Sequence, residues 1–282
     1  MSEKIIDLHT HSTASDGSFT PSELAREAAR AGVAAIALTD HDSVSGIAEI
    51  TAAGEECGLE VIAGVELSTE YENEEVHVVG LFIDPENEAL RGQLRRFVEN
   101  RDNRNVQIIE KLAEAGFSIT PEAVYEANPD SVVARPHIAR YLVATGQAAD
   151  VAEVFDRYIA AGKPCYVERY KITPVEAVHL IHEAGGLAIL AHPCLYKLPR
   201  ETLLYMITEL KEAGLDGIEA LYSRNEGTDE EEYLKIARDF DLLVSGGSDF
   251  HGSSKPDIAI GTGMGDLCVP YTLLEDMKNR FS

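Results

Sequence analysis

The fold is decided by residues 5–38, which read IIDLHTHSTASDGSFTPSELAREAARAGVAAIAL. Two short apolar runs, residues 5–8 and 33–38, have the β-branched composition of buried strands. Between them, Thr20-Pro21-Ser22-Glu23 matches a helix capping box with proline at the first helical position, and Gly32 ends the helix just before the second run. This stretch therefore predicts a strand–helix–strand unit.

The same pattern continues on both sides of a long central segment. Apolar runs of the strand type recur at residues 61–65, 76–83, 187–191, 217–221 and 242–245. A second capping box, Thr173-Pro174-Val175-Glu176, opens a helix that ends at Gly185-Gly186. Alternating strands and helices of this kind predict an α/β protein.

The central segment, residues 86–165, has no strand pattern. Its apolar residues recur at helical spacing instead, for example Leu90, Leu94, Phe97 and Val98. We therefore predict a barrel domain formed by residues 1–85 and 166–282, interrupted by a helical insertion domain at residues 86–165.

Composition excludes several classes of partner. The 282 residues include 24 Lys and Arg against 49 Asp and Glu, a net charge of −25, which disfavours binding to duplex DNA. The apolar runs are far shorter than the roughly 20 residues of a membrane span. Four widely spaced cysteines suggest neither a disulfide framework nor a zinc ribbon. We expect a cytoplasmic protein that does not bind membranes; its oligomeric state stays open.

A set of histidines and carboxylates follows the predicted strands. His9-Thr10-His11 places two imidazoles on the same side of an extended segment, which alone is a weak sign of metal binding. Six of the nine histidines and three carboxylates lie in predicted strands or at their ends: His9, His11, Asp16, His41, Glu66, His77, His192, Asp249 and His251. Strand ends converge in α/β folds. This mixed nitrogen and oxygen set predicts a site for manganese, iron or zinc.

The motifs around these residues resemble those of a known family. They are Asp7-Leu8-His9-Thr10-His11-Ser12, Leu38-Thr39-Asp40-His41-Asp42, Gly64-Val65-Glu66, Leu190-Ala191-His192-Pro193 and Gly247-Ser248-Asp249-Phe250-His251. Over nearly the whole chain they resemble the PHP (polymerase and histidinol phosphatase) family of metal-dependent phosphoesterases. The segment Ala134-Arg135-Pro136-His137 resembles the branch that removes the 3′-phosphate of nucleoside 3′,5′-bisphosphates and degrades short 5′-phosphorylated RNA from its 5′ end.

The resemblance implies a distorted seven-stranded (β/α) barrel with the helical insertion as a cap, and two or three divalent metal ions. It assigns His9, His11, Glu66 and Asp249 to a first metal, Glu66, His77 and His192 to a second, and Asp16, His41 and His251 to a third. Glu66, Asp249 and His192 would then be catalytic, with a metal-bridging hydroxide as the nucleophile.

Three residues of the insertion are candidates for binding substrate. Arg135 has a planar guanidinium that matches phosphate oxygens, although a salt bridge within the insertion is the alternative. His137 could bind phosphate or cap a helix, and Lys163 could bind phosphate or lie in solvent. Outside the insertion, Tyr222 follows a predicted strand and could stack on a base or pack in the core.

Three functions are compatible with these features. The first is hydrolysis of phosphate esters in small phosphorylated nucleotides or short single-stranded RNA. The second is histidinol phosphatase or another small-molecule phosphomonoesterase activity. The third is a noncatalytic metal-binding regulator, which the complete ligand set disfavours.

Overall fold

The structure is a computed structural model that describes residues 4–129, 133–168 and 170–281. The chain divides into two compact units, one of residues 1–92 with 172–282 and the other of residues 93–171. Within the described ranges, no helix is both long enough and apolar enough to cross a membrane.

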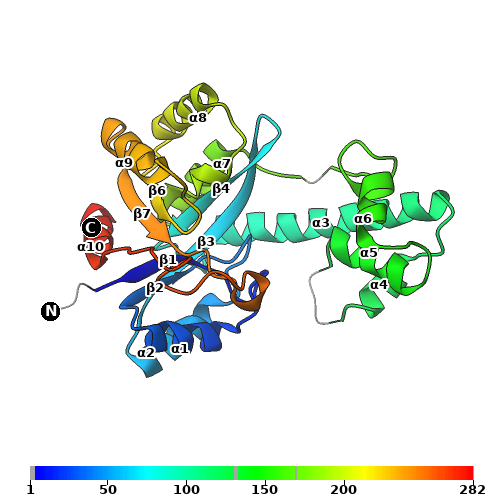
Figure 1. Cartoon of the computed structure of the whole chain (residues 1–282), viewed down its shortest axis with the longest axis horizontal. Coiled ribbons are helices and arrows are strands. Elements are labelled where there is room, and N and C mark those ends of the chain that lie inside the picture. Colours follow the sequence, from blue (N-terminus) through cyan, green and yellow to red (C-terminus); the bar gives the residue numbers. More distant parts are fainter. Residues whose placement is uncertain (1–3, 130–132, 169, 282) are drawn as a thin grey trace. The chain divides into compact units, whose positions relative to one another are not determined.

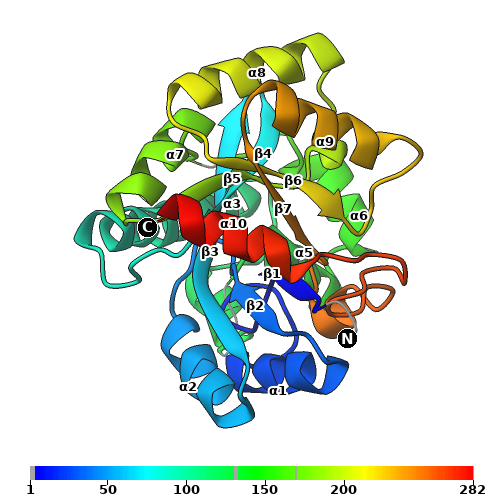
Figure 2. The ribbon, with the colours of Figure 1, turned by 90° about the vertical axis from the view of Figure 1, so that its left-hand side faces the viewer.

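Seven strands of the first unit form one sheet in sequence order (Figure 1; β5 is labelled in Figure 2). They are β1 (Ile6–Thr10), β2 (Ala35–Leu38), β3 (Glu60–Tyr71), β4 (Glu74–Leu81), β5 (Leu187–Leu190), β6 (Gly217–Tyr222) and β7 (Leu243–Gly247). The chain after β7 returns to β1, where the Asp249 N–H donates to the His9 carbonyl and the His11 N–H donates to the Phe250 carbonyl, both at 2.9 Å. These bonds nearly close the sheet into a barrel, which confirms the predicted seven-stranded α/β fold.

Helices cover the outside of the barrel. They are α1 (Pro21–Ala31), α2 (Ile47–Cys57), α7 (Pro174–Glu183), α8 (Arg200–Glu212) and α9 (Asp229–Asp239). Both predicted capping boxes are confirmed. Thr20 Oγ1 accepts from the Glu23 N–H at 3.2 Å, and Thr173 Oγ1 accepts from the Glu176 N–H at 3.2 Å. Gly32 ends α1 in the left-handed conformation, with φ at 77°.

The connection between β3 and β4 differs from a strand–helix–strand unit. The two strands form an antiparallel hairpin, and β4 also pairs antiparallel with β5. Glu72 and Asn73 make the two-residue turn, and both have positive φ, 49° and 67°, as a tight hairpin turn requires. Because β4 runs in the opposite direction, His77 near its start lies at the same barrel end as residues that follow the parallel strands.

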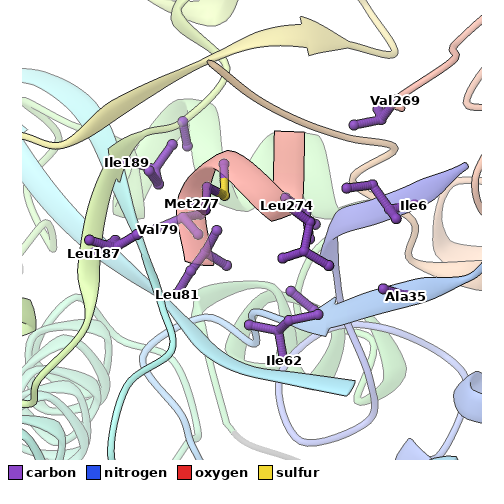
Figure 3. Packing of buried hydrophobic residues seen from close by; sticks show 13 residues of the cluster. Ile6, Ala35, Ile62, Val79, Leu81, Leu187, Ile189, Val269, Leu274 and Met277 are labelled. Atoms are coloured by element: carbon purple, nitrogen blue, oxygen red, sulfur yellow. The ribbon is translucent and has the colours of Figure 1, made fainter. Parts of the chain in front are cut away.

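Apolar side chains of the strands fill the barrel, and the last helix, α10 (Tyr271–Phe281), packs against them. Figure 2 shows α10 lying across the strands, and Figure 3 shows Leu274 and Met277 among the side chains that the strands contribute. Both residues are 0% exposed. Their spacing of three places them on one face of the helix, which therefore belongs to the barrel core.

Leu274→Ala is expected to lower the free energy of unfolding by about 2–5 kcal/mol, because it removes a fully buried side chain and leaves a cavity. Chemical denaturation of the metal-free protein, followed by circular dichroism, measures the change. The exposed neighbour Thr272 is the control, and Thr272→Ala should change stability by no more than about 0.5 kcal/mol. Equal effects of the two substitutions would contradict the core position of α10.

The second unit has its own core. Its described residues form helices and no strand: the larger part of α3 (Glu88–Glu114), then α4 (Pro121–Glu126), α5 (Arg135–Ala144), α6 (Val151–Val154) and the π-helix η1 (Phe155–Ile159). Ile108, Leu112, Ile138 and Leu142 are among the fully buried residues where these helices pack together. The role of residues 86–165 as a cap stays a prediction.

Candidate metal centre

All nine residues of the predicted metal set lie together at one end of the barrel. His9 is on β1, Glu66 on β3 and His77 on β4, and the others follow β1, β2, β5 and β7. Their side chains form four overlapping groups, and within each group the potential ligand atoms lie within 4.8 Å of one another. The groups are His9, Glu66 and His192; His9, His11 and Asp249; His41, Glu66 and His77; and His11, Asp16, His41 and His251.

Glu66 lies at the centre of the cluster and is 0% exposed. Its Oε1 is 2.8 Å from His77 Nδ1 and 2.9 Å from His192 Nε2. Its Oε2 is 3.2 Å from His9 Nε2, 3.2 Å from His11 Nε2 and 3.1 Å from His41 Nδ1. Each oxygen of this one carboxylate therefore faces a different set of imidazoles, as expected of a group that bridges two cations.

Several buried polar atoms at the centre make no hydrogen bond to any group in the described chain. They include His9 Nε2, His11 Nε2, His41 Nδ1, Glu66 Oε2 and His251 Nε2. Buried polar atoms are nearly always paired, and a bound ion is a recognised reason for an exception. Imidazole nitrogens and carboxylate oxygens are ligands for divalent transition metals. The residues present therefore fit a metal centre.

The backbone is distorted where it carries these side chains. The pairing of β1 with β2 shifts register between Asp7 and Thr10, at the position of His9. His192 and Asp249 have φ of 23° and 58°, in the left-handed region that residues other than glycine rarely adopt. Bulges and strained residues of this kind concentrate at functional sites, where they reorient side chains.

The charges in the cluster are strongly coupled. Burial opposes the protonation of His11, but the Asp249 and Glu66 carboxylates outweigh it and raise the pKa of His11 to about 9. Burial likewise opposes protonation of His77, but the Glu66 and Glu75 carboxylates outweigh it and raise the pKa of His77 to about 10. Burial would raise the pKa of Glu66, but the surrounding imidazoles hold it well below its ordinary value. Such a cluster attracts positive charge, and metal ions compete with protons for it.

Three further polar residues contact the cluster, and the sequence indicated this role for none of them, although Tyr222 was a candidate for base stacking or core packing. Glu219 on β6 is 2% exposed and contacts His9 Nδ1 at 3.0 Å. The Tyr222 hydroxyl donates to Asp249 Oδ2 at 2.7 Å, and Lys255 Nζ donates to the same oxygen at 2.7 Å. This leaves Asp249 Oδ1, which is 3.3 Å from His11 Nε2, facing the cluster. Tyr222 is 4% exposed, so packing and hydrogen bonding account for it better than base stacking. No motif marks Glu219 or Lys255.

The three candidate substrate residues belong to the second compact unit. The Arg135 guanidinium lies 5.8 Å from the ring centres of both Phe155 and Tyr166. Its only hydrogen bond of those described is a long one, 3.4 Å, to the Ile159 carbonyl, and no described carboxylate pairs with it. His137 Nδ1 accepts from the Ala134 N–H at 3.1 Å, so it caps the start of α5. Lys163 is exposed.

A nearly closed α/β barrel with this buried cluster at one end is typical of a metal-dependent enzyme, because active sites of α/β barrels lie at the strand ends and the ligand set would hold divalent ions there. The chain belongs to the PHP domain family, whose family model matches residues 7–168. It is therefore a PHP metal-dependent phosphoesterase, as the sequence motifs indicated.

Three relatives within this family are similar to the chain over most of its length. It is 38% identical to a 5′-3′ exoribonuclease of Haemophilus influenzae over 88% of this chain and 90% of the relative. It is 36% identical to a 3′,5′-nucleoside bisphosphate phosphatase of Chromobacterium violaceum over 94% of each chain. It is 32% identical to a phosphoribosyl 1,2-cyclic phosphate 1,2-diphosphodiesterase of Eggerthella lenta over 88% of this chain and 94% of the relative.

Two solved structures are similar to this chain over nearly its whole length. An amidohydrolase from Chromobacterium violaceum, solved with bound sulfate and no metal, superposes with a TM-score of 0.77 at 35% identity over 98% of this chain and 96% of its own. A candidate metal-dependent phosphoesterase from Bifidobacterium adolescentis gives the same TM-score at 31% identity and the same coverage. The fold is thus shared along nearly the full length of the chain.

Proposed function

We propose that this protein hydrolyses phosphate esters of small nucleotides, namely the 3′-phosphate of nucleoside 3′,5′-bisphosphates, and degrades short 5′-phosphorylated oligoribonucleotides from the 5′ end. The observation that carries the proposal is the cluster around Glu66, where four overlapping ligand groups meet. The two relatives named for these activities, each matched over most of its length, support the choice of substrate.

The proposed cofactor is a set of two or three divalent ions of manganese, iron or zinc. His9, His11, Glu66 and Asp249 would hold the first, Glu66, His77 and His192 the second, and Asp16, His41 and His251 the third. The pairing of His77 with His192 is supported by their distances, because His77 Nδ1 and His192 Nε2 approach the same oxygen of Glu66, Oε1, and lie 3.3 Å from each other. His41 Nδ1 also lies 3.1 Å from Glu66 Oε2, so the ion assigned to His41 would lie next to the same carboxylate. Divalent ions bound there would supply an activated water and neutralise charge on the phosphoryl group.

The protein's own residues set up this chemistry. Glu66 keeps its negative charge in a fully buried position and would hold two cations at a fixed separation. Asp249 directs Oδ1 to the cluster because Tyr222 and Lys255 hold Oδ2. His192 reaches Glu66 from a strained backbone position. Preorganised groups of this kind stabilise the transition state without having to reorganise during the reaction.

Binding of a second substrate phosphate is assigned to Arg135, with His137 and Lys163 as further candidates. The lack of a described carboxylate partner and the two flanking aromatic rings support this role for Arg135 over a structural salt bridge. A guanidinium without a carboxylate partner remains available for a bidentate phosphate contact. His137 would bind through Nε2, since Nδ1 is occupied by the helix cap.

The net charge of −25 favours small substrates or short single-stranded RNA over duplex DNA, since long polyanions are repelled. Four free cysteines, Cys57, Cys165, Cys194 and Cys268, suit the reducing cytoplasm that we propose as its compartment.

The test is a substrate panel. Metal-reconstituted protein is incubated with 3′,5′-bisphosphoadenosine, a short 5′-phosphorylated RNA, histidinol phosphate and phosphoribosyl 1,2-cyclic phosphate, and the products are identified by mass. We expect release of the 3′-phosphate from the bisphosphate and of mononucleotides from the RNA. Turnover of histidinol phosphate alone would replace the proposal with the small-molecule phosphatase alternative.

A cyclic phosphate diester is the second candidate substrate. The relative named for that activity matches 88% of this chain at 32% identity, and the cluster geometry alone does not distinguish a monoester from a diester. Preferred turnover of phosphoribosyl 1,2-cyclic phosphate in the same panel would favour this candidate.

A further inference from the structure

Glu219 contacts two members of the cluster at once. Its Oε1 lies 3.0 Å from His9 Nδ1, and its Oε2 accepts from the backbone N–H of His192 at 2.7 Å. His9 comes from β1 and His192 follows β5, whereas Glu219 lies on β6, at an irregularity in its pairing with β7. One buried carboxylate thus connects three separate parts of the barrel behind the cluster.

The contact with His9 fixes which ring nitrogen faces the cluster. An ionised carboxylate only accepts hydrogen bonds, so His9 Nδ1 must carry the proton that it shares with Glu219. In a neutral imidazole this leaves a lone pair on Nε2. His9 Nε2 is the buried atom without a hydrogen bond that lies 3.2 Å from Glu66 Oε2. Glu219 therefore selects the tautomer that presents a ligand atom to the cluster.

The contact with His192 supports a strained backbone. His192 has φ of 23° and ψ of 60°, which is unfavourable for a residue with a Cβ. Its N–H is directed into Glu219, while its ring Nε2 lies 2.9 Å from Glu66 Oε1. Strain of this kind persists only where surrounding contacts hold it.

We propose that Glu219 is a positioning residue of the metal centre, which sets the His9 tautomer and holds the His192 backbone so that both rings present Nε2 to the cations. The inference rests on the metal cluster of the proposed function. Carboxylates that orient a metal-bound histidine typically contribute 10- to 100-fold to metal affinity.

Glu219→Gln tests the tautomer directly. The His192 N–H can only donate, so the amide oxygen of the new side chain should stay on that atom. The amide NH₂ then faces His9 Nδ1 and donates to it, which favours the tautomer with the proton on Nε2. We expect zinc affinity, measured by competition with a chelator, to fall about 10- to 100-fold.

Asp216 provides a matched control. Its Oδ2 also accepts from a histidine ring nitrogen, His182 Nε2 at 2.8 Å, and from a backbone N–H, that of Ala188 at 2.9 Å. Neither partner belongs to the cluster. Asp216→Asn therefore makes the same chemical change in a similar pair of contacts, and it should leave zinc affinity within about twofold. Thermal unfolding in excess chelator shows how much either substitution affects stability without metal.

A second measurement does not require a variant. In zinc-loaded wild-type protein with ¹⁵N-labelled histidine, long-range NMR correlations should show His9 with its proton on Nδ1 and zinc on Nε2. Zinc on Nδ1 of His9, or equal zinc affinity in Glu219→Gln and wild type, would overturn the role of Glu219. Loss of stability in chelator with unchanged affinity would also overturn it and leave a purely structural role. Failure of the wild type to bind zinc, manganese or iron would instead reject the metal centre itself.

Discussion

Glu66→Gln is expected to lower kcat/KM by about 1000-fold, roughly 4 kcal/mol, and to lose most of the bound divalent metal. The reason is that Glu66 brings a buried negative charge within 3.2 Å of five imidazoles, through two oxygens that face different groups. Glutamine keeps the shape but removes the charge and replaces one oxygen with an NH₂ donor, which cannot bind a cation.

Activity on the best substrate of the panel and metal content by elemental analysis are measured on the same preparation. The control is Glu27→Gln, since Glu27 lies on α1 at the surface and pairs with Arg30 at 3.2 Å. Glu27→Gln should match the wild type in both activity and metal content. Full metal content with unchanged turnover in Glu66→Gln would refute the bridging role.

Arg135→Ala should discriminate between substrates. If Arg135 binds a phosphate remote from the bond that is cleaved, the loss of one charge-assisted bidentate contact costs about 1.5 to 3 kcal/mol, or roughly 10- to 150-fold in kcat/KM. A nucleoside bisphosphate should show this decrease, whereas a substrate without the second phosphate should be little affected. Metal content should not change, because the cluster and Arg135 belong to different compact units.

Arg157 is the matched control for this prediction. It lies on the π-helix of the same unit, 5.2 Å from the ring centre of Tyr158, but it pairs with the Glu153 carboxylate at 2.5 Å. Its guanidinium already has an anionic partner, so Arg157→Ala should leave kcat/KM unchanged for both substrates. Equal losses on the two substrates in Arg135→Ala, accompanied by lower thermal stability, would support a structural role for Arg135.

Local signals in the sequence were sufficient to predict much of the fold. The capping boxes at Thr20 and Thr173 depend on residues three apart, so they could be recognised without tertiary information, and both form as expected. The nine candidate ligands could be grouped because strand ends in α/β folds converge. The direction of β4 could not be predicted from the sequence, because an apolar run fits a parallel or an antiparallel neighbouring strand equally well.

The residues behind the cluster could not be predicted for a different reason. Glu219 and Lys255 are ordinary charged residues in the sequence, and their roles arise from a bulge in β6 and from the turn after β7. Their partners, His9 and Asp249, are distant along the chain or held in an unusual backbone conformation. Only the assembled barrel brings these groups within hydrogen-bonding distance.

The metal centre can be tested by anomalous diffraction from crystals of the zinc-reconstituted protein, recorded at the zinc absorption edge. We expect two or three zinc ions among the nine residues, each about 2.0–2.2 Å from imidazole nitrogens and carboxylate oxygens, with Glu66 bound to two of them. Zinc ions bound elsewhere, or a cluster in which four or more of the nine residues contact no ion, would contradict the proposed metal centre.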